Sequence, residues 1–144
     1  TVIGFSVHDT MNYLLSPNEL FAAFTSVSNT MHDESVFMFD LTTEHNIRRF
    51  FDGKITKHVR GKAEVVWENS YDVDSKIVQS ILRVTSPDGS FKVETHRQRI
   101  YEKEEILPLL CDAGFEILDI FGDYSFKKPS GKTIMINYIV RRKR

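Results

Sequence analysis

The feature that most constrains the fold is a capped helix between two short apolar runs. Residues 1–8 and 36–39 are apolar without strict alternation, which is typical of strands covered on both faces. Between them, Ser16-Pro17-Asn18-Glu19 places a hydroxyl at the N-cap, proline at the first helical position and glutamate at the third. The motif predicts a helix, and the order strand, helix, strand predicts a right-handed parallel crossover of an α/β fold.

The pattern changes after Asp52-Gly53, where it predicts an antiparallel meander. Segments near 61–70, 75–86 and 90–101 are strand-like. The turns between them contain the aspartate, proline and glycine that are typical of tight reversals.

A further helix and a final strand pair are predicted for the remaining residues. Residues 102–113 carry an apolar stripe, and Gly114 is placed to end the helix in a left-handed cap, although Pro108 argues against a regular helix. Strands near 115–124 and 132–140 should pair antiparallel. We predict one partial domain in three parts: residues 1–52, 53–101 and 102–144.

Composition and charge exclude several classes of protein. The 19 basic residues nearly balance the 20 acidic ones, so the charge calls for neither nucleic acid nor an anionic membrane as partner. Cys111 is the only cysteine, which excludes an internal disulfide or a cysteine-cluster metal site and predicts a reducing, cytoplasmic setting. The longest apolar runs fall short of the roughly 20 residues that span a bilayer, so we expect a soluble protein. The opening residues are already strand-like, so we also expect that a segment preceded them.

Several motifs occur in an order that points to one family. Residues 9–15 read Asp-Thr-Met-Asn-Tyr-Leu-Leu, and residues 36–40 read Val-Phe-Met-Phe-Asp. Later come Trp67-Glu68-Asn69, a Glu-x-His-x-x-Arg-x-Tyr pattern over 94–101, and Leu-x-x-Ala-Gly-Phe-Glu over 110–116. This series resembles small-molecule class I (Rossmann-like) S-adenosylmethionine-dependent methyltransferases from their fourth strand onward.

The resemblance implies a fold, a cofactor and a reaction. It implies an α/β fold, the later half of a Rossmann-like methyltransferase sheet, with an inserted antiparallel meander and an antiparallel final strand pair. The implied cofactor is S-adenosylmethionine, and the implied reaction is methyl transfer to nitrogen or oxygen of a small molecule. The glycine-rich loop and the acidic residue that hold the cofactor in this family are not among these residues, so the isolated segment is expected to be inactive.

The loops that follow the first two strands supply the first candidate residues. Ligands of open α/β sheets bind beyond the carboxyl ends of the strands. By resemblance, Val7, His8 and Asp9 border the cofactor, and Asp40 follows the second strand as a substrate-binding candidate. Asp9 has the alternative role of a cap or turn residue.

Side chains of the nearby helix and of the meander supply the acceptor-binding and catalytic candidates. Asn12 and Tyr13 could orient an amine or hydroxyl, although Tyr13 could equally be a packing residue. His96 is the general-base candidate, with His8 as its rival, and Tyr13 is a second catalytic candidate. The alternative for His96 is an exposed strand surface. Two more substrate-binding candidates are Trp67, with core packing as its alternative, and Arg97, on the other face of the His96 strand.

Two functions therefore remain open, and neither needs a metal. The five histidines have no close ligand spacing, and no nucleophile elbow or phosphate loop occurs. The first function is the methyltransferase, and the alternative is a non-catalytic α+β domain that binds a small ligand. For the methyltransferase we expect an unpaired sheet edge, and therefore either a missing amino-terminal segment or self-association.

Overall fold

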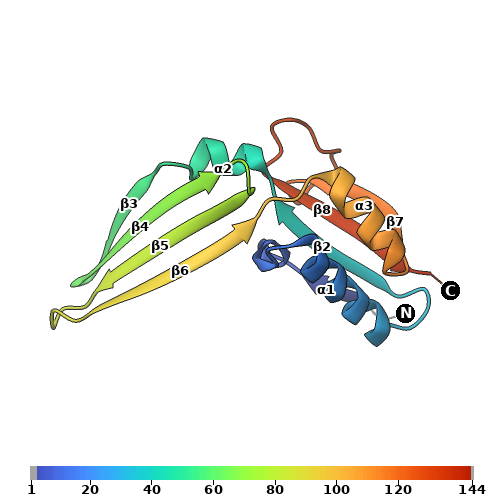
Figure 1. The fold of residues 1–144 in the computed structure, drawn as a ribbon, viewed down its shortest axis with the longest axis horizontal. Coiled ribbons are helices and arrows are strands. Elements are labelled where there is room, and N and C mark those ends of the chain that lie inside the picture. The colour runs from blue at the N-terminus through green and yellow to red at the C-terminus, as the bar shows by residue number, and fades with distance from the viewer. Residues whose placement is uncertain (1–2, 144) are drawn as a thin grey trace.

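Two four-stranded sheets lie side by side in the computed structural model, which describes residues 3–143 (Figure 1). The first sheet has the strand order β1-β2-β8-β7, and the second has the order β3-β4-β5-β6. Residues 1 and 2, which the sequence analysis includes in the first strand, lie outside the described residues.

The predicted crossover opens the chain. Its elements are β1 (Ile3–Ser6), the short 3₁₀ helix η1 (Thr10–Tyr13), α1 (Pro17–Thr30) and β2 (Val36–Thr42). β1 and β2 pair in parallel, as predicted. The capping box also forms: the Ser16 hydroxyl accepts from the Glu19 amide at 3.2 Å, and the Glu19 carboxylate accepts from the Ser16 amide at 3.0 Å.

The meander follows a second short helix and has one strand more than predicted. Its elements are α2 (Glu44–Phe50), β3 (Ile55–Arg60), β4 (Ala63–Asp72), β5 (Ile77–Thr85) and β6 (Phe91–Arg99). Each strand pairs antiparallel with the next. The sequence pattern does not predict β3, because its two aliphatic residues, Ile55 and Val59, are exposed and give no core-facing stripe.

The last part of the chain completes the first sheet. It consists of α3 (Lys103–Asp112), β7 (Phe115–Gly122) and β8 (Met135–Arg142). β8 inserts between β2 and β7 and runs antiparallel to both, which confirms the predicted final pair. Gly114 has φ 85°, the left-handed cap predicted for it. α3 continues through Pro108, and the carbonyl that loses its partner there belongs to the exposed Glu104.

An aromatic cluster forms the core of the first sheet. The Phe39 ring stacks on Tyr138 with centroids 4.9 Å apart and lies 5.0 Å from Phe24 of α1. α1 and α3 cover the same face of this sheet (Figure 1). Leu20 of α1 and Ile106 of α3 are fully buried there. Among residues 3–143, the helices are all too short or too polar to span a bilayer.

Glu105, near the start of α3, links this helix to the second sheet. Its carboxylate accepts from Arg99 at 2.7 Å, from Lys76 at 3.0 Å and from the Glu102 amide at 3.0 Å. Burial alone would raise the pKa of Glu105, but these hydrogen bonds outweigh it and lower the pKa to about 2. The folded state therefore favours the charged carboxylate of Glu105.

We expect Glu105→Gln to remove a pH-dependent part of the stability. The folded pKa of about 2 lies below the ordinary value of 4.5, so the carboxylate stabilises the fold above pH 4.5 and loses this effect as pH falls from 4.5 toward 2. After a discount for solvent screening, the variant should lose about 1–2 kcal/mol at pH 7. Urea unfolding of both proteins at several pH values should show the difference shrinking with acid. A constant difference would contradict this assignment.

Candidate functional site

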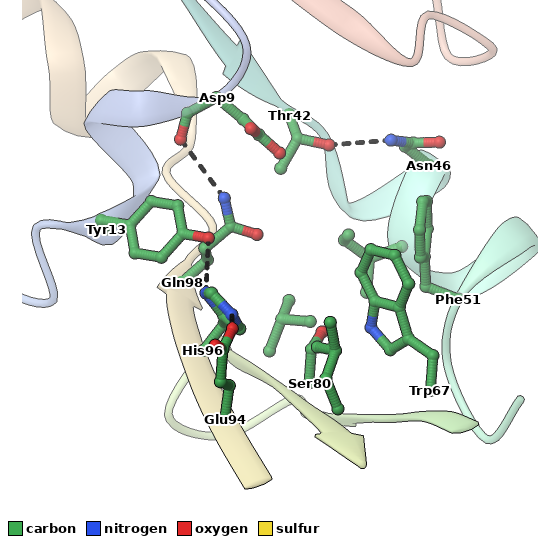
Figure 2. A pocket seen from close by; sticks show the side chains of 13 residues that line it. Asp9, Tyr13, Thr42, Asn46, Phe51, Trp67, Ser80, Glu94, His96 and Gln98 are labelled. Atoms are coloured by element: carbon green, nitrogen blue, oxygen red, sulfur yellow. Dashed lines mark hydrogen bonds and ion pairs between the residues drawn. The ribbon is translucent and has the colours of Figure 1, made fainter. Parts of the chain in front are cut away.

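A cavity of about 470 Å³ lies where the two sheets meet (Figure 2). The loop after β1, the end of β2 with α2, and one face of the meander form its walls. The residues that line it are Asp9, Tyr13, Thr42, Asn46, Ile47, Phe51, Trp67, Val78, Ser80, Leu82, Glu94, His96 and Gln98. The cavity thus combines an apolar floor and aromatic walls with a few carboxyl, amide, hydroxyl and imidazole groups, as ligand sites commonly do.

The period-two geometry of β6 decides which of its side chains reach the cavity. Glu94, His96 and Gln98 alternate onto the cavity face. Arg97 lies on the opposite face, in a separate surface hollow with Asp72 and neighbouring residues. The structure therefore does not bring Arg97 to the group that lines the cavity.

Tyr13 of η1 and His96 of β6 meet at the cavity. The Tyr13 hydroxyl lies 3.1 Å from His96 Nδ1, and the Glu94 carboxylate lies 3.6 Å from Nε2 (Figure 2). Burial, and then the charge of Asp9, raise the pKa of Tyr13, so its hydroxyl stays protonated. The hydroxyl can donate to Nδ1 in one imidazole tautomer or accept from Nδ1 in the other. A neutral imidazole that accepts at Nδ1 carries its hydrogen on Nε2, on the side of Glu94.

Asp9 reaches the cavity from a loop with unusual backbone geometry. His8 and Asp9 have φ values of 61° and 50°, in the left-handed region that non-glycine residues rarely occupy. Asp40 accepts both of their amides, at 2.9 Å from His8 and 2.6 Å from Asp9. Burial, opposed by a hydrogen bond from Gln98, and the charge of Asp40 raise the pKa of the Asp9 carboxyl. Asp40 itself is 1% exposed and faces the loop, so it is not placed to contact a ligand in the cavity.

Asn12 is fully buried and holds the two sheets together. Its Oδ1 accepts from the Thr42 amide at 3.0 Å, and its Nδ2 donates to the Arg99 carbonyl at 2.8 Å. Both ends of the amide are occupied by backbone groups of β2 and β6, and Asn12 does not line the cavity. The contacts of Asn12 are therefore those of a structural link rather than of a substrate-binding group.

The predicted candidates thus divide into two groups. Asp9, Tyr13, Trp67 and His96 come together around the cavity, whereas Val7, His8, Asn12, Asp40 and Arg97 do not line it. Sequence reasoning gave no role to Glu94 and Gln98, although both share the alternation of His96 along β6. Nor did it single out Asn46, which donates to the Thr42 hydroxyl at 2.9 Å. In the part of the chain that the structure describes, no cluster of three or more His, Cys, Asp or Glu side chains could hold a metal ion.

No family model matches the chain. It is 24% identical over 128 residues to the "Putative methyltransferase YqeM" of Bacillus subtilis (strain 168), covering 87% of the chain and 52% of that protein. It is 22% identical over 141 residues to another protein named "Putative methyltransferase", from Geobacillus sp. (strain WCH70), covering 93% of the chain and 56% of that protein. The chain spans about half the length of the curated relatives it matches.

Solved structures show the same relationship. An S-adenosylmethionine-dependent methyltransferase from Clostridium acetobutylicum ATCC 824 has a TM-score of 0.86 at 25% identity, covering 99% of this chain and 58% of that one. The CcbJ methyltransferase from Streptomyces caelestis has a TM-score of 0.80 at 14% identity, with 99% and 57% coverage. The amino pentose methyltransferase CalS10 from Micromonospora echinaspora, solved with bound S-adenosylmethionine, has a TM-score of 0.68 at 16% identity, with 98% and 58% coverage.

The chain has a Rossmann-like α/β fold with an inserted antiparallel sheet. The features that define this class of protein are the parallel crossover, the antiparallel strand β8 and the cavity beside the meander. Within that class, the chain is related to the S-adenosylmethionine-dependent methyltransferases. The Asp9 carboxyl and the Tyr13 ring face the cavity beyond the end of β1, the edge at which ligands of open α/β sheets bind.

Proposed function

We propose that these residues are the carboxyl-terminal portion of an enzyme that transfers a methyl group from S-adenosylmethionine to nitrogen or oxygen of a small molecule. The relatives and structural neighbours support the reaction class. In this proposal residues 1–52 and 102–144 complete the Rossmann-like sheet, and residues 53–101 shape the acceptor pocket. The non-catalytic α+β binding domain is not favoured, because the fold matches methyltransferases over nearly the whole chain.

The observation that carries the proposal is the Tyr13–His96 pair at 3.1 Å inside the cavity. When bound, S-adenosylmethionine supplies an electrophilic methyl group on a sulfonium. The protein then has to align the acceptor, exclude water and remove a proton where the acceptor carries one. The Tyr13 hydroxyl from η1 and the His96 imidazole from β6 can together perform the last of these tasks.

The pair forms a short proton path. The acceptor's proton passes to the Tyr13 oxygen as the Tyr13 proton passes to His96 Nδ1. The imidazolium that forms faces Glu94, whose carboxylate 3.6 Å from Nε2 stabilises the positive charge. His96 thus acts as the base and Glu94 as the group that orients and stabilises it.

The remaining cavity residues position the acceptor. Trp67 and Phe51 form an aromatic wall opposite His96, as Figure 2 shows, and such rings favour an apolar or cationic group. Asp9, at the cofactor border, can accept a hydrogen bond from an amine or hydroxyl. Val7 and His8 stay proposed as backbone contacts to the cofactor.

The first sheet needs a partner along β1. β1 is the terminal strand of its sheet, and its Ile3 and Phe5 side chains are 70% and 71% exposed. Unpaired strand edges with exposed apolar side chains promote association. We propose that an upstream segment covers this edge in the whole protein, and that residues 1–144 alone self-associate.

The exposed free thiol of Cys111 fits a cytoplasmic setting.

Calorimetric titration with S-adenosylhomocysteine tests the proposed function. We expect this compound to bind a longer protein that carries the upstream residues, and to bind residues 1–144 weakly or not at all. The physical reason is that only one border of a cofactor site lies among the described residues. Adenosine serves as the control ligand and should bind the longer protein more weakly. If neither protein binds S-adenosylhomocysteine, the methyltransferase proposal fails.

A further inference from the structure

A buried carboxylate lies next to the cavity without lining it. Asp40, near the carboxyl end of β2, is 1% exposed. It accepts three hydrogen bonds from distant parts of the chain: the His8 amide at 2.9 Å, the Asp9 amide at 2.6 Å, and the hydroxyl of Tyr124. Burying a carboxylate costs free energy, and these three donors offset that cost. The question is what the fold gains from a charged group at this position.

The reason lies in the backbone that the carboxylate holds. His8 and Asp9 both have left-handed φ values, and such consecutive residues are strained when neither is glycine. Hydrogen bonds to a charged acceptor are stronger than neutral ones and can offset this strain. One Asp40 oxygen accepts from the His8 amide and the other from the Asp9 amide. The carboxylate therefore stabilises the strained conformation at both residues.

Tyr124 in turn holds the carboxylate. Burial, followed by the hydrogen bond to Asp40 and its charge, raises the pKa of Tyr124 to about 12, so the hydroxyl stays protonated and donates. The backbone amide of Tyr124 donates to Asn137 Oδ1 at 2.7 Å, and this bond fixes Tyr124 against β8.

The conformation of the loop decides what reaches the cavity. From the left-handed position of Asp9, its carboxyl faces the cavity, and its carbonyl accepts from Gln98 of β6 at 3.3 Å and from the Asn12 amide at 3.0 Å. The second of these bonds starts η1, which carries Tyr13. A change in the backbone of residues 8 and 9 would therefore displace both Asp9 and Tyr13.

We propose that Asp40 is a positioning residue, which holds His8 and Asp9 in the conformation that carries Asp9 to the cofactor border of the cavity and sets the start of η1. The inference rests on the proposed function, since the consequence of losing this conformation is weaker binding of the cofactor. Asp40 acts through the backbone and does not contact the ligand itself.

The first test is Asp40→Asn in the full-length protein, compared with Tyr124→Phe, which removes only the third hydrogen bond to the carboxylate. Asparagine keeps one acceptor oxygen but turns an amino group toward the second backbone amide, so one bond is lost. We expect the Kd of S-adenosylhomocysteine to rise about 10-fold in Asp40→Asn and less than about 3-fold in Tyr124→Phe, which keeps both backbone bonds. The amide proton resonances of His8 and Asp9 should shift upfield only in Asp40→Asn.

A second pair of variants leaves the buried carboxylate intact. His8→Asn and His8→Val both remove the imidazole, but asparagine tolerates a left-handed backbone and valine does not. We expect His8→Val to bind S-adenosylhomocysteine about 10-fold more weakly than His8→Asn. This pair gives an answer even if Asp40→Asn does not fold.

The outcomes separate the two proposals. If the wild-type full-length protein does not bind S-adenosylhomocysteine, the proposed function fails. If the wild type binds but the two His8 variants bind equally well, or folded Asp40→Asn binds like the wild type, the positioning role of Asp40 is overturned.

Discussion

His96→Ala should lower kcat/KM for methyl transfer about 100-fold in the full-length protein, because it removes the base of the proposed proton path. The Tyr13 hydroxyl would lose its acceptor 3.1 Å away, and Glu94 would face no imidazole. The measurement is formation of S-adenosylhomocysteine with the best acceptor from a panel of small amines and alcohols. The Kd of S-adenosylhomocysteine itself should change less than about 3-fold, since His96 is placed toward the acceptor.

Two further variants make this prediction specific. Tyr13→Phe keeps the ring but removes the hydroxyl that links the acceptor to Nδ1, so it should lower kcat/KM by about 10-fold or more. His32→Ala changes an exposed histidine next to the end of α1 and serves as the control, with no expected loss. If His96→Ala kept full activity, His96 would be a surface residue of the strand, the alternative that the sequence left open.

Asn12→Ala should destabilise the fold by about 2–4 kcal/mol, the largest stability effect expected of a single polar side chain here. The buried Thr42 amide and the partly buried Arg99 carbonyl, which Asn12 bonds at 3.0 Å and 2.8 Å, would both lose their partner. Because these bonds connect the two sheets, the junction should loosen as well. Urea unfolding measures the change in free energy, and hydrogen exchange of the Thr42 amide measures the loosening.

Asn18→Ala provides the matched control for this prediction. Asn18 is exposed in the first turn of α1, so its loss should change the free energy of unfolding by less than about 0.5 kcal/mol. If Asn12→Ala were equally mild and Thr42 exchange unchanged, the link between the sheets would lie elsewhere. Asn12 would then be free for the substrate-binding role predicted from the sequence.

Much of the fold was predictable because local signals agreed with the tertiary structure. The capping box at Ser16–Glu19 and the cap at Gly114 depend on residues close together in the chain, and both formed as predicted. β3 was not predictable in the same way, because its residues 55–60 gain their conformation from pairing with β4.

The candidate site was predictable only in part, for a related reason. Alternation along β6 put Glu94, His96 and Gln98 on one face, and the structure places that face toward the cavity. Nothing in the sequence indicated that the hydroxyl of Tyr13, 83 residues away from His96, lies within hydrogen-bond distance of its ring. Asp40 and Asn12 look like ligand-binding groups in the sequence, but the backbone groups that occupy them come from remote segments.

By itself the sequence determined the periodicities, caps and turns, and hence an α/β crossover, a meander and a final strand pair, because these depend on neighbours within a few residues. The tertiary structure alone decided that β8 inserts beside β2 and that the two sheets meet at a cavity. It also decided which polar side chains face a ligand and which satisfy buried backbone. Both decisions depend on contacts between segments that are distant in the sequence. Buried polar groups of these segments must find hydrogen-bond partners once water is excluded, and no local sequence pattern specifies which groups pair.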